Sequence, residues 1–145
     1  MYTLPKILIE FLREYREREL TQFLIVGFGG ALGAMARYGV DIFITHRVAT
    51  NFIGTFVVNI SGSFLLGIFV GFGASQIQWP PEIRNLFAVG FLGSYTTFST
   101  LSVATIQLAH KGELISASIN LSSTILLGLA VAALGFYLGR VLTHT

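Results

Sequence analysis

The chain has 145 residues, of which 53% are hydrophobic and only 11% are charged, with a formal net charge of +2. Soluble domains carry about a quarter charged residues, so this composition indicates an integral membrane protein. The small net charge gives no reason to expect a nucleic-acid partner, and the absence of cysteine excludes disulfides, thiolate metal sites and a thiol nucleophile.

Long uncharged stretches divide the chain into spans. Charged residues and histidines are absent between Arg47 and Glu82, between Arg84 and His110, and between Glu113 and Arg140. Each stretch exceeds the roughly 20 residues that cross a hydrocarbon core. With an earlier apolar segment they predict an all-α domain over residues 20–145, whose four transmembrane helices lie at about 21–44, 51–73, 84–109 and 114–138.

Residues 1–19 are predicted to form an amphipathic helix that lies on the membrane. Apolar residues such as Phe11 and Leu12 recur at helical spacing, and basic residues such as Arg13 and Arg16 occupy the other face. The alternative is a solvated terminal extension without functional weight.

The first membrane helix combines close-packing glycines with one charged pair. Gly29 and Gly33 form a GxxxG motif, which lets another backbone approach closely in a membrane. Arg37 and Asp41 lie one turn apart and can pair. Arg37 is then either a snorkelling anchor near the interface or part of a vestibule that attracts anions.

The second membrane helix carries an asparagine near its centre. Asn59 is followed one turn later by Ser63 on the same face. An amide in hydrocarbon is costly unless it is hydrogen-bonded. Asn59 therefore either joins two helices or donates its amide N–H groups to an anion.

The third membrane helix is predicted to break within residues 90–100. Gly93 has low helix propensity and would tolerate a backbone turn that other residues do not. Five hydroxyl side chains nearby can divert backbone hydrogen bonds: Ser94, Thr96, Thr97, Ser99 and Thr100. Irregular backbone at membrane depth is tolerated where it is buried or lines a wet cavity, so this segment is either a packing kink or a binding site.

The fourth membrane helix carries a polar stripe. Ser116, Asn120 and Thr124 are spaced four residues apart, and Ser123 flanks them. Four short-looped helices make a small bundle with little room to enclose a pathway. We therefore expect a homo-oligomer.

The charge distribution of the four-helix domain favours neither orientation in the membrane, although the basic residues of the N-terminal extension make the count six against three. Outside the N-terminal extension, one side holds Arg84 and Arg140, and the other holds Arg37, Arg47 and Lys111. Because cytoplasmic loops are normally enriched in basic residues, this near balance permits insertion in both orientations.

The polar side chains of the predicted spans are mostly neutral. The sequence shows no embedded glutamate or histidine to relay protons, no HExxH motif and no glycine-rich phosphate loop, so we expect no enzymatic activity. Amides, hydroxyls and the positive edges of aromatic rings remain. Such donors can replace water around a small anion without trapping it.

Three segments in order resemble the Fluc (CrcB) family of fluoride channels: residues 29–38, 54–64 and 90–100. The resemblance extends from about Phe23 to Arg140 and excludes the amphipathic start. Each motif alone is weak, but the three in this order and in a chain of this length are specific.

The resemblance implies a dual-topology, antiparallel homodimer in the cell membrane. Its implied function is passive, fluoride-selective export that confers fluoride resistance, with membrane lipid, fluoride and a second copy as its partners. It also implies a structural Na⁺ ion, not transported, held at the dimer centre by the backbone carbonyls of Gly93 and Thr96.

By the same resemblance, Asn59 is the pore asparagine and Phe98 is the first pore phenylalanine. The family's second phenylalanine corresponds to Leu101, which has no positive ring edge, so Phe98 acts alone or conduction is slower. The implied fluoride pathway contains Asn59, Phe98, Ser99, Thr100 and Leu101, with Arg37 in the vestibule. The family's hydroxyl track on the fourth helix falls on Ser116, Asn120, Ser123 or Thr124.

Two other functions remain open from the residues. A four-helix multidrug exporter also forms antiparallel dimers, but it needs an embedded carboxylate that this sequence lacks. A non-transporting scaffold subunit would explain the glycines and leaves the hydroxyl-rich break without a purpose.

Overall fold

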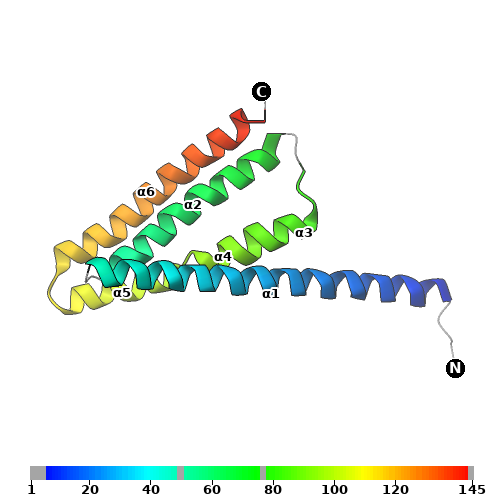
Figure 1. The fold of residues 1–145 in the computed structure, drawn as a ribbon, viewed down its shortest axis with the longest axis horizontal. Coiled ribbons are helices and arrows are strands. Elements are labelled where there is room, and N and C mark those ends of the chain that lie inside the picture. The colour runs from blue at the N-terminus through cyan, green and yellow to red at the C-terminus, as the bar shows by residue number, and fades with distance from the viewer. Residues whose placement is uncertain (1–5, 49–50, 76–77, 144–145) are drawn as a thin grey trace.

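The computed structural model describes residues 6–48, 51–75 and 78–143, and its regular elements in this part of the chain are all helical. They are α1 (Lys6–Val48), α2 (Asn51–Ser75), α3 (Pro81–Ile83), the π-helix η1 (Arg84–Leu92), α4 (Gly93–Tyr95), α5 (Phe98–His110) and α6 (Leu114–Val141) (Figure 1). Within these described ranges, four spans are long and apolar enough to cross a membrane: Arg13–Arg47, Phe52–Ala74, Pro81–His110 and Leu114–Val141. The predicted four-helix membrane architecture with an interrupted third span is confirmed.

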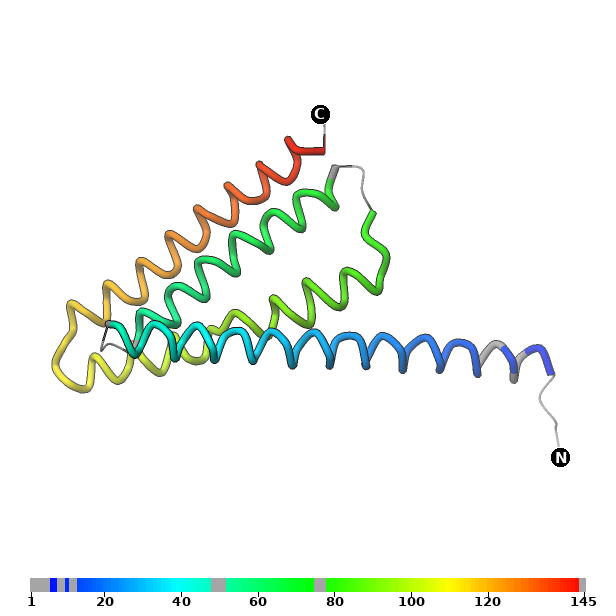
Figure 2. The backbone as a smooth tube through the Cα atoms, in the orientation of Figure 1, coloured from blue at the N-terminus to red at the C-terminus, as the bar shows by residue number. Residues whose placement is uncertain are grey.

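The helices form two closely packed pairs. Figure 1 shows α2 and α6 side by side, and the first half of the third span, α3 to α4, running along α1. After the break, α5 packs against α6 and α2 instead. The chain trace in Figure 2 shows the beginning of α1 projecting beyond the other helices. The bundle is therefore open, and much of its apolar surface faces outward.

Helix α1 runs without interruption through the boundary predicted at residue 19. Its 43 residues correspond to about 65 Å at a rise of about 1.5 Å per residue, roughly twice the hydrocarbon thickness. Exposed ion pairs, Arg13 with Glu17 at 3.3 Å and Arg18 with Glu14 at 2.7 Å, support the projecting part. Residues 1–5 lie outside the described residues, and attachment of this segment to the membrane surface stays a prediction.

Close backbone contact joins α2 to α6. Gly67 and Gly71 of α2 lie against the α6 backbone, and Gly135 and Gly139 of α6 lie against the α2 backbone, so a Cβ atom at any of them would overlap backbone atoms. Association in lipid depends on such van der Waals packing, because lipid tails are as apolar as the side chains.

The predicted GxxxG motif of the first span packs in the same way. Cβ atoms at Gly29 and Gly33 would overlap the carbonyl groups of Leu86 and Phe91 in η1. The prediction that this motif allows another backbone to approach is confirmed. It fixes the first half of the third span against α1.

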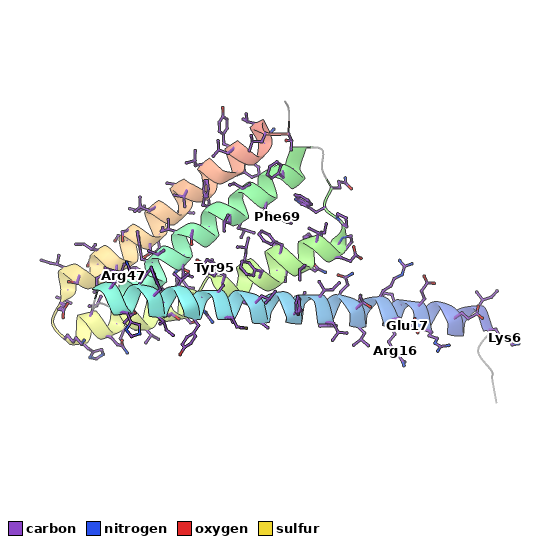
Figure 3. All side chains as sticks on the ribbon, viewed as in Figure 1. Lys6, Arg16, Glu17, Arg47, Phe69 and Tyr95 are labelled. Atoms are coloured by element: carbon purple, nitrogen blue, oxygen red, sulfur yellow. The ribbon has the colours of Figure 1, made fainter. Side chains whose placement is uncertain are left out.

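A row of aromatic rings connects the loop after α2 to the break in the third span. Trp79 stacks on Phe69 with ring centroids 4.9 Å apart, and its indole N–H donates to the Phe69 carbonyl at 3.1 Å. The row continues through Phe87 and Phe91 to Tyr95, with centroid distances of 5.3, 5.7 and 6.0 Å. Figure 3 shows Phe69 and Tyr95 lying between the helices. These contacts fix η1 and α4 against α2.

We expect Gly135→Val to destabilise the protein, because the new side chain overlaps the α2 backbone at Phe64. Overpacking of this kind typically costs about 1–3 kcal/mol. Thermal unfolding of the detergent-purified protein, followed by size-exclusion chromatography, measures the effect. Gly27→Val is the matched control, because nothing lies within 4 Å of a Cβ at Gly27. Equal losses in both variants would contradict the packing role.

Candidate functional site

The third span is interrupted at Thr96 and Thr97. Both residues are extended, with φ and ψ of −78° and 154° at Thr96 and of −152° and 120° at Thr97. The Thr96 amide and hydroxyl both donate to the Leu92 carbonyl, at 3.1 and 3.0 Å, which ends the first half. The Thr97 hydroxyl accepts from the Thr100 amide at 3.3 Å, which caps the start of α5.

Asn59 of α2 bonds to the backbone of Thr97 with both ends of its amide. Its Nδ2 donates to the Thr97 carbonyl at 3.0 Å, and its Oδ1 accepts from the Thr97 amide at 2.8 Å. Asn59 is 9% exposed and Thr97 is 8% exposed, so the pair is shielded from solvent. Two roles were predicted for Asn59, a bond between helices and donation to an anion. The structure shows the first, because Asn59 joins α2 to the break in the third span.

These hydrogen bonds take donors away from two carbonyls. In a continuous α-helix the Thr97 amide would bond the Gly93 carbonyl, but here it donates to Asn59. The Thr100 amide would bond the Thr96 carbonyl, but it donates to the Thr97 hydroxyl. Hard cations bind to carbonyl oxygens, so the backbone oxygens of Gly93 and Thr96 are ligands of the type that the predicted Na⁺ ion requires.

Gly93 itself has an ordinary helical backbone, with φ of −63° and ψ of −31°. The atom nearest to an added Cβ, the Ala88 carbonyl oxygen, would be 3.6 Å away. The prediction that Gly93 provides a turn closed to other residues is therefore wrong. The irregular conformation lies at Thr96 and Thr97, in regions that any residue adopts.

A groove of about 370 Å³ lies beside the break, between α2, α5 and α6. Asn59, Phe98, Leu101 and Thr124, four of the predicted pathway residues, line it together. Phe98 is 71% exposed, whereas Leu101 is only 3% exposed. The described lining residues are all uncharged, and they further include Ser63, Leu66, Thr96, Thr97, Ile125, Gly128, Leu129 and Ala132.

Ser99 and Thr100 lie in the exposed first turn of α5 and are not among the described lining residues of the groove. Their hydroxyl oxygens are 3.1 and 3.2 Å from the Thr97 hydroxyl oxygen. They extend the polar cluster from the break along the start of α5.

Most of the predicted polar stripe of α6 lies away from this groove. Asn120 is 3% exposed, and its Nδ2 donates to the Thr105 hydroxyl of α5 at 3.0 Å. The Thr124 hydroxyl donates to the Asn120 carbonyl at 2.7 Å. Ser116 and Ser123 are half-buried and, like Asn120, are not among the described lining residues of the groove. The structure thus brings only Thr124 of this stripe to the groove.

Arg37 is half-buried on α1 and is also not among the described lining residues of the groove. Within the ranges that the structure describes, the ion pairs do not include one between Arg37 and Asp41. The Asp41 side chain lies instead against Gly54 of α2. A vestibule role for Arg37 stays a prediction.

Residues on α2 close to Asn59 also contact the break. The Ser61 and Tyr95 hydroxyl oxygens are 3.0 Å apart. A Cβ at Gly62 would overlap the Thr96 methyl group and lie 3.1 Å from the Tyr95 ring. Sequence reasoning gave Ser61 and Gly62 no role at the site. The small residues that closely follow Asn59 in the sequence could have indicated that this part of α2 packs against the break.

Comparison with known proteins identifies the family. The family model described as CrcB-like protein, Camphor Resistance (CrcB), matches residues 24–136. The chain is 41% identical over 120 residues to a fluoride-specific ion channel FluC of Hydrogenobaculum sp. (strain Y04AAS1), which covers 83% of this chain and 98% of that protein. It is 38% identical over 120 residues to a protein of the same name from Acidobacterium capsulatum, which covers 82% and 96%. It is 42% identical over 121 residues to fluoride-specific ion channel FluC 1 of Listeria monocytogenes serovar 1/2a, which covers 83% and 98%. This chain belongs to the CrcB-like family.

Proposed function

We propose that this protein is a fluoride-selective channel that lets fluoride leave the cytoplasm passively. The observation that carries the proposal is the uncharged groove at the interrupted third span, in a chain about 40% identical to proteins named fluoride-specific ion channel. A multidrug exporter is not favoured, because the described groove residues include no carboxylate to balance a cationic substrate.

The groove offers donors suited to a small anion. Asn59 uses one of its two amide hydrogens on Thr97, which leaves the second for a ligand. The Ser63 hydroxyl and the exposed ring of Phe98 lie in the same groove. Partial positive charges of this kind replace hydration without the strong binding that would stop conduction.

The proposed assembly is an antiparallel homodimer around a cation. Each copy contributes the Gly93 and Thr96 carbonyls, so two breaks meeting at a two-fold axis would present about four oxygens. With no carboxylate among these ligands, a monovalent ion such as Na⁺ fits better than a divalent one. The bound ion would supply positive charge that holds the two breaks together, and it would not be transported.

Liposomes containing the purified protein should release fluoride and not chloride, once a potassium ionophore removes the opposing voltage. The expected selectivity follows from the small, uncharged groove, which offers donors and no fixed cation. Ion-selective electrodes measure both effluxes, and protein-free liposomes are the control. Equal release of the two anions would contradict the proposal.

The dual topology is tested with Ala74→Cys at the end of α2. Because the natural chain has no cysteine, an impermeant maleimide reports this site alone. We expect labelling from both sides of the membrane, since the basic residues outside the extension are nearly balanced. Labelling only from the cytoplasm would mean that the N-terminal charges fix one orientation, and it would exclude an antiparallel dimer.

Fluoride efflux should require sodium without moving it. Liposomes prepared entirely in sodium should release fluoride faster than liposomes in a large organic cation, because the latter does not fit between carbonyls. Tracer sodium measured in parallel should not cross. If fluoride left the two kinds of liposome at the same rate, the proposed cation site would be wrong.

A further inference from the structure

We propose that Asn59 is a positioning residue for the cation: its amide keeps the Gly93 carbonyl free and thereby sets the affinity for Na⁺. This inference rests on the proposed function for the existence of the ion. Its own support is the pair of hydrogen bonds between Asn59 and Thr97.

The Asn59 side chain acts as a substitute for a neighbouring strand. It exchanges two hydrogen bonds with the N–H and C=O of one extended residue, as paired residues of an antiparallel sheet do. The contact is buried, so removing it would leave two backbone groups of Thr97 without partners, which is costly in an apolar environment.

The released Thr97 amide has one obvious alternative acceptor. The Gly93 carbonyl lies four residues earlier, at the position that a continuous helix would use. Closing that bond would straighten the third span and occupy an oxygen proposed to bind the cation. Asn59 therefore controls the site through the backbone, without touching the ion.

Gly62, one turn after Asn59, makes room for the same break. A Cβ there would overlap the Thr96 methyl group, and the backbone of Thr96 carries the second candidate oxygen. The Thr96 hydroxyl bonds the Leu92 carbonyl, and serine would keep that bond while lacking the methyl group. Gly62 thus gives a second, independent way to displace the carbonyls.

The experiment measures two quantities for each variant: the sodium concentration that gives half-maximal fluoride efflux from liposomes, and equilibrium binding of radioactive sodium to the purified protein. Asn59→Ser is too short to reach Thr97 with two bonds. We expect it to weaken sodium binding about tenfold, on the scale of two buried hydrogen bonds. High sodium should then partly restore efflux.

Asn120→Ser is the matched control. It also removes a buried asparagine bond, the one to Thr105, but on the α5–α6 contact away from the two carbonyls. Its sodium affinity should stay as in the unaltered protein, whatever happens to its rate of efflux.

Gly62→Ala should also weaken sodium binding, and the double variant Gly62→Ala/Thr96→Ser should recover it, because the overlapping methyl group is gone. This pair decides the question if Asn59→Ser does not fold. If Asn59→Ser folds and binds sodium as the unaltered protein does, the inference is wrong. If Asn59→Ser does not fold, unchanged sodium binding by Gly62→Ala overturns the inference instead. Neither outcome would contradict the proposed cation site itself. Failure of the unaltered protein to bind sodium would overturn the proposed cation site and the inference with it.

Discussion

The structure depends on one constraint: backbone N–H and C=O groups at membrane depth need partners inside the protein. A break in a membrane helix exposes several such groups at once. Here Asn59 satisfies both groups of Thr97, and the Thr97 hydroxyl satisfies the Thr100 amide. The interruption is thereby held by defined bonds, and the Gly93 and Thr96 carbonyls do not receive the amide donors that a continuous helix would give them.

Close packing around the break makes these bonds possible. Glycines bring α1 against η1 and α2 against α6, so the helices approach at backbone distance. The aromatic row that ends at Tyr95 fixes η1 and α4 against α2. Asn59 and Gly62 then meet the break from one helix, the first holding it and the second leaving room.

The groove and the break are two aspects of the same local structure. The bonds that interrupt the third span also place Phe98 at the beginning of α5, where it lines the groove with Asn59. A single chain leaves this groove open and the Phe98 ring largely exposed. Enclosing a pathway here would require a further surface, and the proposed homodimer offers one.

The sequence alone determined the membrane class, the four spans, the interruption of the third and the family, because hydropathy, helix propensity and motif order are local properties of the chain. Tertiary structure decided which polar groups meet. Asn120 points to α5, Leu101 is buried, and Asn59 finds its partner in the backbone of Thr97. These outcomes depend on how each helix is rotated and how closely its neighbours approach, and residue spacing within one helix does not specify either.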